Sequence, residues 1–283
     1  MRLIKRIFAF LLLLIIALIM LGYLASKIPY GHRIAVLKIQ GVIVNPYPLV
    51  QKIENLRENK RVVALVLMVD SPGGSVGASQ EIYRAIERFR NSGKPVVVSM
   101  GDVAASGGYY VSVPANYIYA NPGTITGSIG VIIVHIAYKD LMGKLGIKAT
   151  AIKSGKFKDT LSPFRDLNEE EKKYLEQTVN EVYEQFIQAI LKYRSNKISE
   201  EKLREIADGR VFSGRVAKEL GLVDELGSLY DAIDKAKELA GYPDAKPLFI
   251  QEEKPLLKRI TGVELEELKV FTSYAPLYYL MDF

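Results

Sequence analysis

Ser106 is the residue of this chain whose surroundings best suit covalent chemistry. It lies in the run Gly101-Asp-Val-Ala-Ala-Ser-Gly-Gly-Tyr-Tyr110, between two alanines and a glycine pair. A helix is expected to start here, which would leave the hydroxyl exposed beside free backbone N–H groups. A nucleophile that attacks a carbonyl needs such donors for the oxyanion that forms. A serine at this position is also a common helix N-cap, but a cap does not require small neighbours.

The base that would activate this serine is not evident from the residues. The chain has two histidines and no cysteine, which excludes thiol nucleophiles, disulfides and thiolate zinc sites. His32 closely follows an apolar N-terminus, and His135 lies in an apolar run that favours a packed histidine. A lysine can act as a base where burial favours its neutral form. Lys153, Lys156 and Lys158 are clustered, and the residues alone do not choose among them.

Two further glycine-rich segments are candidates for the same site. Residues 71–75, Ser-Pro-Gly-Gly-Ser, follow a strand at the edge where open parallel sheets bind ligands. Their paired glycines would let a substrate approach and would direct N–H groups at it, although a plain strand-to-helix turn uses the same residues. Residues 124–130 contain Ser128, which the residues alone interpret as a simple turn residue.

The elements that must position these residues follow a βαβ pattern, which predicts a parallel sheet. The continuous apolar run at residues 62–69 is typical of a strand buried on both faces. A long helix should begin after Asn168, which forms a pattern resembling a capping box with Glu171. The other strands are expected over 34–39, 95–100, 117–120, 131–136 and 148–152. The other helices are expected over 48–58, 76–91, 106–113, 139–145, 199–207, 214–220 and 228–240.

The N-terminal segment is predicted to anchor the chain in a membrane. Residues 7–24 are mostly apolar, and at about 1.5 Å per residue they span roughly 27 Å, enough to cross a bilayer core. Basic residues precede this run, so the N-terminus is expected in the cytoplasm and the bulk of the chain on the outer (periplasmic or extracellular) face of the plasma membrane. A cleaved signal peptide is the alternative, but residues 23–27 are a poor cleavage site.

Composition divides the chain into three expected segments. Residues 1–28 are a basic end with the anchor, 29–245 form one α/β domain, and 246–283 are a C-terminal extension with an apolar, aromatic end that should pack on this domain, a neighbour or the membrane. The net charge of +6 is spread along the chain. This distribution suits a surface near anionic lipid and argues against nucleic-acid binding, because no basic block is interleaved with aromatic residues.

Six motifs occur in a fixed order along residues 33–240. They are Asp70-Ser-Pro-Gly-Gly-Ser-Val76, Ala104-Ala-Ser-Gly-Gly-Tyr-Tyr110, Gly123-Thr-Ile-Thr-Gly-Ser-Ile-Gly130, Lys153-Ser-Gly-Lys-Phe-Lys-Asp159, Gly209-Arg-Val-Phe-Ser-Gly-Arg215 and Gly221-Leu-Val-Asp-Glu-Leu-Gly227. Each motif is weak alone, but together they resemble the signal peptide peptidase A family in its short, single-copy form. The resemblance implies a Clp-protease/crotonase-like α/β fold, with a parallel sheet and flanking helices, and a serine peptidase without a cofactor or metal.

The resemblance also implies roles for five residues. Ser106 would be the nucleophile and Lys158 its general base, while Ser128 would hydrogen-bond the lysine. The N–H groups of Gly74 and Gly107 would form the oxyanion hole. Short members are implied to be homo-oligomers in which serine and lysine meet between subunits. The implied substrates are remnant signal peptides and other apolar peptides.

Three other functions compete with this one. A related membrane protease cleaves a stomatin-like partner with the same dyad, but its expected C-terminal membrane region is not found in this sequence. A crotonase-like acyl-CoA enzyme shares the fold, yet it would normally be soluble and use a carboxylate base. An inactive membrane scaffold would not need Ser106, Ser128 and Lys158.

Overall fold

The computed structural model describes residues 10–20, 31–250 and 278–281. The chain divides into two compact units, Met1–His32 and Arg33–Phe283. In the first unit, residues 10–20 form a helix with exposed side chains. The rest of the predicted membrane span, residues 7–9 and 21–24, lies outside the described residues. Within the part of the chain that is described, no helix is both long and apolar enough to cross a membrane.

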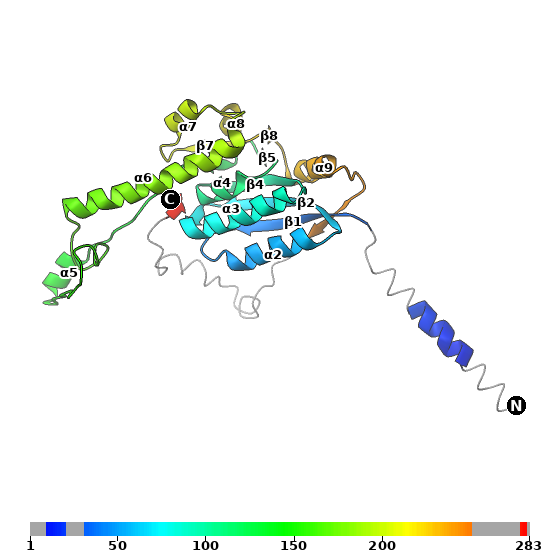
Figure 1. The fold of residues 1–283 in the computed structure, drawn as a ribbon, viewed down its shortest axis with the longest axis horizontal. Helices are drawn as coiled ribbons and strands as arrows, with labels where there is room; N and C mark the ends of the chain where they lie inside the picture. Colours follow the sequence, from blue (N-terminus) through cyan, green and yellow to red (C-terminus); the bar gives the residue numbers. More distant parts are fainter. Residues whose placement is uncertain (1–9, 21–30, 251–277, 282–283) are drawn as a thin grey trace. The chain divides into compact units, whose positions relative to one another are not determined.

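A largely parallel sheet organises the second unit (Figure 1). In the described residues it has eight strands, and all neighbours are parallel except β6 and β7. The main path runs β7 (Val211–Ser213), β6 (Ile125–Gly127), β4 (Val96–Ala105), β2 (Val62–Ser71), β1 (Arg33–Gln40) and β9 (Lys246–Phe249). Beside this path, β5 (Tyr117–Ala120) pairs with β4 and with β8 (Glu225–Leu226).

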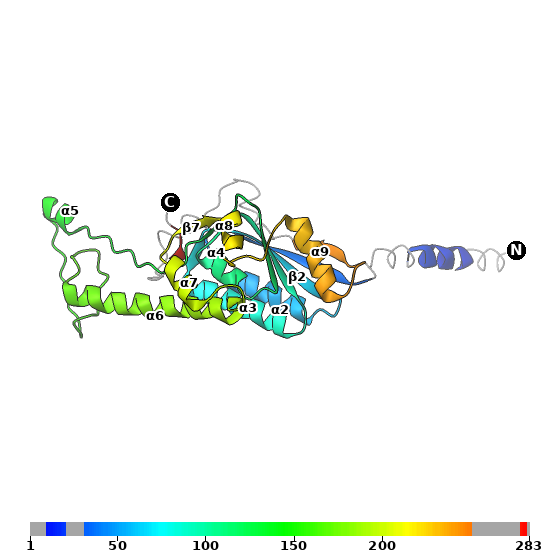
Figure 2. The ribbon, with the colours of Figure 1, turned by 90° about the horizontal axis from the view of Figure 1, so that it is seen from above.

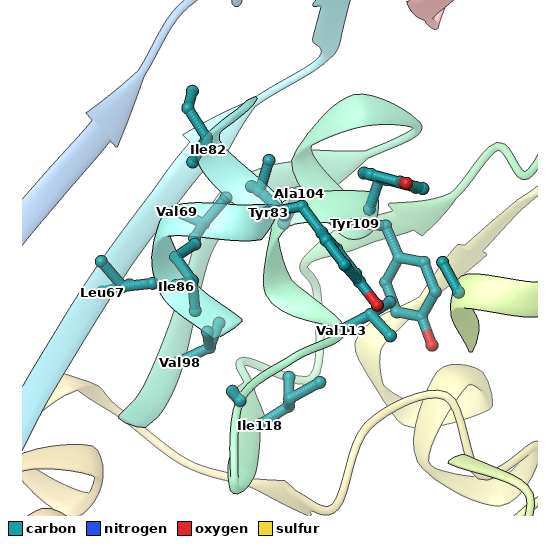
Figure 3. Packing of buried hydrophobic residues seen from close by; sticks show 14 of the residues in the cluster. Leu67, Val69, Ile82, Tyr83, Ile86, Val98, Ala104, Tyr109, Val113 and Ile118 are labelled. Atoms are coloured by element: carbon teal, nitrogen blue, oxygen red, sulfur yellow. The ribbon is translucent and has the colours of Figure 1, made fainter. Parts of the chain in front are cut away.

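Helices cover both faces of this sheet, because its strands are apolar on both sides. Leu37 and Leu67 belong to the larger core, in which Figure 3 labels Leu67, and their neighbours Val36 and Val66 belong to the smaller one. The smaller core is closed by α9 (Leu229–Ala240). The larger core receives α2 (Tyr47–Glu58), α3 (Val76–Asn91), α4 (Gly107–Ser112), α6 (Glu169–Arg194), α7 (Glu200–Ile206) and α8 (Gly214–Glu219).

Several sequence predictions are confirmed closely. The helix predicted over 76–91 and the strand over 117–120 have these bounds in the structure. The run at 62–69 is buried on both faces within β2. The capping box is present: Asn168 Oδ1 accepts from the Glu171 N–H at 2.9 Å, and the Glu171 carboxylate accepts from the Asn168 N–H at 3.0 Å.

Two predicted strands are wrong. Residues 131–136 and 148–152 are irregular, apart from an isolated bridge at Ile132. Both lie in a projecting segment, residues 131–168, which we call the arm; it also holds α5 (Lys139–Lys144), a helix with no buried residue. Figures 1 and 2 show α5 carried away from the sheet. The apolar side chains of these two segments are β-formers, but no strand of the sheet lies alongside to accept their backbone hydrogen bonds.

The strands nearest the candidate site are longer or more numerous than predicted. The strand expected to end at residue 100 continues to Ala105, because the second half of β4 leaves β5 and pairs with β6. The glycine-rich segment at residues 71–75 includes a short strand, β3 (Gly73–Ser75), which pairs antiparallel with β10 (Tyr278–Leu280). Both described pieces of the 246–283 extension, β9 and β10, therefore pair with strands of the second unit.

Candidate active site

Ser106 occupies a strained turn between a parallel strand and a helix. It directly follows β4 and precedes α4, and its backbone has φ 52° and ψ −116°. A non-glycine residue pays for such a conformation with about 1–3 kcal/mol, and these positions concentrate at functional sites. The turn is held by two backbone hydrogen bonds, from the Ser106 N–H to Gly127 O and from the Tyr110 N–H to Ser106 O, both 2.8 Å.

The Ser106 hydroxyl is not a helix cap. Its side chain makes no capping hydrogen bond to α4, and the residue is 1% exposed. Among the described residues, Ser106 Oγ and Ser79 Oγ are the two buried side-chain polar atoms without a hydrogen-bond partner. An unpartnered buried hydroxyl calls for an explanation, and a nucleophile that waits for substrate supplies one.

The glycines after Ser106 are small for two different reasons. A Cβ on Gly108 would lie 2.5 Å from Ser71 O, so this glycine lets α4 pack against the end of β2. A Cβ on Gly107 would lie 2.7 Å from Ser79 Oγ, 3.0 Å from Tyr279 O and 3.1 Å from Gly73 Cα. Gly107 therefore borders the segment that carries Tyr279, whereas the space expected beside Gly108 is filled by the chain's own backbone.

Three glycine backbones surround the Tyr279 carbonyl oxygen. Gly73 has φ +106°, and a Cβ there would lie 2.0 Å from Tyr279 O and 2.7 Å from Gly107 N. Gly74 is paired with Tyr279 in the β3–β10 register, and on its other side it bridges Ile43. The first N–H groups of a helix have no partner within the helix, so the Gly107 N–H at the start of α4 is suited to a carbonyl oxygen.

The tail segment 278–281 runs through the site as an extended strand. On one side it pairs with β3, and the Met281 N–H donates to Pro72 O at 2.9 Å. On the other side the N–H and the carbonyl of Tyr278 exchange hydrogen bonds with Ile132, both 3.2 Å. Of the three surfaces on which the tail was expected to pack, these four residues lie on this domain. Nothing in the sequence pattern indicated that they enter this site.

The Tyr279 side chain fills an aromatic pocket that sequence analysis missed. Tyr279 is fully buried, and its ring centroid lies 5.0 Å from that of Tyr110 and 4.7 Å from that of Phe186. Its hydroxyl donates to Val182 O at 3.2 Å. Burial raises the pKa of Tyr279, so the phenol stays neutral. The pocket joins α4 to the middle of α6, a pairing that no local pattern could reveal.

Ser128 lies beside Ser106 through the pairing of β4 with β6. It follows Gly127, whose carbonyl accepts from the Ser106 N–H, and its own N–H donates to Arg210 O at 2.8 Å. Ser128 has φ 49° and is 7% exposed. With Ser106 it is one of two non-glycine residues at positive φ in the described segments. The shared strain distinguishes Ser128 from the simple turn residue that its local sequence suggests.

Lys158 is not brought to Ser106 within one chain. Lys158 is exposed. Its segment of the arm is held at the start of α6, because the nearby Thr160 Oγ1 lies 3.4 Å from Glu171 Oε1. The run of buried residues that packs α6 on the core begins only at Val182, eleven residues later, which is about 16 Å along a helix. The structure therefore gathers Ser106, Ser128 and the glycines, and leaves Lys158 in the projecting arm.

The three clustered lysines nevertheless differ in their partners. Lys153 pairs with Asp159, and Lys156 pairs with Glu170. Across the described residues, no carboxylate partner is found for the Lys158 amine. An ion pair with a carboxylate stabilises the charged form of a lysine. The lack of such a pair therefore distinguishes Lys158 from Lys153 and Lys156.

Arg165 holds the lysine-bearing segment in place. Its Nε donates to Asp159 Oδ2 at 3.0 Å, and its Nη1 donates to Glu171 Oε2 at 2.8 Å. The hydrogen bond from Arg165, with that from the Asn168 N–H, lowers the pKa of Glu171 to about 2. Arg165 also lowers the pKa of Asp159, with Lys153 contributing. This clamp was not predicted, because a charge cluster in a loop looks like a solvated surface.

A groove with apolar and polar walls adjoins the tail segment. Its volume is about 590 Å³, and it lies between the base of the arm and the first half of α6. Its apolar lining includes Ile132, which also contacts Tyr278. The other lining residues are the apolar Val131, Ile133, Leu167, Leu175 and Val179 and the polar His135, Lys172, Glu176 and Asn180. The groove therefore continues the slot in which the tail lies.

The site combines a strained serine, set between a parallel strand and a helix, with glycine N–H groups beside an extended peptide. These features are typical of a serine hydrolase with an α/β fold that acts on peptides. Comparison with known proteins agrees. The model of peptidase family S49 matches residues 88–242, more than half of the chain. The chain belongs to this family, and it is a serine protease.

Individual relatives are consistent with this assignment. A putative protease of Synechocystis sp. is 42% identical over 81% of this chain and 83% of its own length. A putative signal peptide peptidase SppA of Enterococcus faecium is 37% identical over 69% of this chain; the match spans 56% of that protein. A solved structure of a membrane-bound stomatin-specific protease, in mutant form, superimposes with a TM-score of 0.50 at 15% identity, covering 80% of this chain and all of that one. The fold is Clp-protease-like.

Proposed function

We propose that this protein is a membrane-anchored endopeptidase with a Ser-Lys dyad, which degrades remnant signal peptides and other apolar peptides. The observation that carries the proposal is the Tyr279 carbonyl oxygen, which lies close to the backbones of Gly73 and Gly107, and Gly107 directly follows the unpartnered Ser106. A peptide bound as this segment is bound presents its carbonyl to the nucleophile and to two N–H donors.

In the proposed mechanism, neutral Lys158 takes the Ser106 proton as Oγ attacks the peptide carbonyl carbon. The N–H groups of Gly74 and Gly107 stabilise the oxyanion. The lysine then gives its proton to the leaving amine, and an acyl-enzyme ester remains. Water that loses a proton to the same lysine hydrolyses the ester and restores Ser106. Ser128, which follows β6 and the Gly127 carbonyl that accepts from the Ser106 N–H, orients the lysine amine.

The dyad in this proposal forms between subunits. Lys158 lies in the arm, which exposes several large apolar side chains, among them Val134, Leu141 and Leu145 at 57–66% exposure. Exposed apolar patches of this kind mark interaction surfaces. A second copy of the chain that buried the arm would also desolvate Lys158, which favours its neutral amine.

The substrate class follows from the slot and its surroundings. The slot pairs with an extended backbone on both sides, and apolar residues form more than half of the lining of the adjoining groove. The predicted anchor at residues 7–24 would hold the site at the outer face of the plasma membrane, where remnant signal peptides remain after secretion. The Clp-protease-like fold, shared with a stomatin-specific protease, keeps cleavage of a stomatin-like membrane protein as the second candidate.

The test compares four variants on a panel of apolar peptides, with products identified by mass spectrometry. Ser106→Ala and Lys158→Ala should each lower turnover by about 10³-fold or more, because each removes a member of the dyad. Ser128→Ala should lower it less. Lys156→Ala is the matched control, since this lysine is in the same loop but pairs with Glu170, and it should hydrolyse peptides at the normal rate. Normal turnover by Lys158→Ala would refute the dyad, and cleavage confined to a stomatin-like protein would favour the second candidate.

A further inference from the structure

Basic side chains gather at the edge of the sheet that lies opposite the candidate active site. The parallel strands begin at this edge, whereas Ser106 follows the end of β4 at the other edge. Arg33 is paired with Lys246 in the register of β1 with β9, and its N–H donates to Arg61 O at 2.8 Å. Lys60 directly precedes Arg61 in the chain. We call these four side chains the basic edge.

The side chains of the basic edge have no ion pair or hydrogen bond with any other described residue. Three of them are exposed, and Arg33 is half-buried. The acidic side chains in the same connecting segments are Glu58, which pairs with Arg57 at 3.5 Å, and Asp244. The positive charge of this edge is therefore in excess, and it is not neutralised by carboxylates of the fold.

A structural role at helix ends does not explain these cations. Crossover helices end at the edge where parallel strands begin, and a cation near a helix C-terminus is stabilised by the helix dipole. Lys94 has this role, because its amine donates to Arg57 O at 2.7 Å and to Asn59 O at 2.9 Å, where α2 ends. The basic edge makes no such hydrogen bond within the described residues, so its charges are left for another partner.

The chain enters the second unit at the basic edge. Arg33 is the first residue of β1 and of this unit. Residues 25–32 separate it from the end of the predicted membrane span at residue 24. At about 3.4 Å per residue, a fully extended connection reaches about 30 Å. The predicted anchor therefore confines Arg33 to within about 30 Å of the bilayer.

We propose that the basic edge binds the anionic headgroups of the membrane that holds the anchor. The proposal rests on the membrane anchor of the function proposed above. Lysine and arginine side chains close to a membrane are attracted by its negatively charged lipids. Because the basic edge makes no ion pair among the described residues, no internal interaction has to be broken when a headgroup binds.

This contact would determine the direction in which the catalytic serine faces. β4 runs from Val96, near the basic edge, to Ala105, which directly precedes Ser106. A strand of this length spans about 30 Å. With the basic edge on the headgroups, the active site is held about 30 Å away from them, and an apolar peptide reaches it only after it has left the lipid.

The experiment measures energy transfer between the full chain and a membrane. The chain is reconstituted in nanodiscs of phosphatidylcholine, with or without phosphatidylglycerol, in which some headgroups carry an acceptor dye. Because the sequence has no cysteine, Asn91→Cys carries the one donor dye; this exposed residue ends α3 and leads into β4 at the basic edge. Energy transfer should be higher with phosphatidylglycerol, and the difference should vanish at about 1 M salt, where the Debye length is about 3 Å.

A donor at the opposite edge is the control for orientation. Asn45→Cys is exposed and lies just beyond Ile43, which bridges Gly74 beside the active site. Its energy transfer should be lower than that of Asn91→Cys in both kinds of disc. Equal transfer from the two positions would contradict the proposed orientation.

Charge reversal identifies the side chains responsible. Lys60→Glu combined with Arg61→Glu should remove the difference between the two discs, and this variant should hydrolyse an apolar peptide in detergent at the wild-type rate, which shows that it folds. Lys173→Glu combined with Arg215→Glu changes the net charge by the same amount, at exposed residues that have no ion pair in the described part of the chain. This control should keep the difference, and its loss there would assign the effect to net charge, against the proposal.

The outcomes separate the lipid contact from the function on which it rests. A chain that inserts in both discs and shows equal transfer in them refutes the contact, while peptide hydrolysis in detergent still supports the proposed function. A chain that associates with neither disc overturns the anchor and the contact together. Association only with discs that contain phosphatidylglycerol supports the contact and refutes the anchor.

Discussion

The strained backbone at Ser106 makes a prediction about stability that is separate from activity. With φ 52° and ψ −116°, this position suits glycine better than serine or alanine. Relief of about 1–3 kcal/mol of strain outweighs the roughly 0.5–1 kcal/mol that a glycine loses in chain entropy. The free energy of unfolding of Ser106→Gly should therefore be about 1 kcal/mol higher than that of Ser106→Ala.

Urea denaturation of the two variants measures this difference, and neither should hydrolyse peptides. Because both variants lack the hydroxyl, the effect of removing it cancels in the comparison. Equal unfolding free energies would mean that the turn is not strained.

Gly73 is the residue at which a single methyl group should close the site. A Cβ there would lie 2.0 Å from the oxygen that occupies the slot and 2.7 Å from Gly107 N, at a φ of +106°. Gly73→Ala should lower kcat/KM by about 100-fold or more, because the substrate carbonyl can no longer reach its donors. The readout is hydrolysis of an apolar peptide under conditions where the variant is folded.

Gly77→Ala is the matched control for this substitution. A Cβ on Gly77 meets nothing within 4 Å, and the residue lies in α3. Its turnover should equal that of the wild type. A fully active Gly73→Ala protein would show that the reacting carbonyl does not lie where the Tyr279 carbonyl lies.

At the scale of elements, the arm depends on the Arg165 clamp. Glu171 has a folded-state pKa of about 2, below its ordinary value of 4.5. A carboxyl whose pKa is lowered on folding contributes stability that is fully present above its ordinary pKa. That contribution is lost as the pH falls toward the folded-state value. The arm should therefore loosen between about pH 4.5 and pH 2.

Pepsin, which works in this range, can report the change. Cleavage within residues 153–168, normalised to an unstructured peptide at each pH, should accelerate as the pH falls. Arg165→Gln should be cut rapidly throughout the window, because its arm has lost the clamp already. If wild type and variant show the same pH profile, the clamp does not hold the arm.

The elements also show where sequence reasoning succeeds and where it stops. Local patterns predicted α3 and the Asn168 capping box, since propensity and capping act over a few residues. They failed for residues 131–136 and 148–152, where strand-forming residues have no strand to pair with. The position of Ser106 was predictable from its small neighbours, but its strain depends on the β4–β6 pairing, which is a long-range contact. The Tyr279 pocket joins residues about a hundred positions apart and leaves no local signal.

For the whole molecule, an active site shared between subunits can be tested by mixing inactive chains. Ser106→Ala and Lys158→Ala each lack one member of the dyad. If the dyad forms between neighbours, co-assembly brings an intact Ser106 from one chain to an intact Lys158 from the other. Peptide hydrolysis should then return to a sizeable fraction of the wild-type rate.

The control is a mixture of Ser106→Ala with a Ser106→Ala, Lys158→Ala double variant, which has no intact nucleophile and should stay inactive. Failure of the first mixture to recover activity, with mixed assemblies demonstrated by two different affinity tags, would place the dyad within one chain. A wild-type protein that is monomeric and fully active in a sizing column would lead to the same conclusion.

The slot between β3 and Ile132 has a consequence for what can be degraded. The slot pairs with the backbone on both edges of a bound peptide. A substrate must therefore first break the backbone hydrogen bonds that it makes within its own chain. A helical segment released from a lipid bilayer has to unwind before it is cut. A well-folded protein domain has no unfolded segment that could enter the slot. Substrates are then selected by how readily their backbone unfolds. This selection protects folded proteins at the same membrane surface from cleavage.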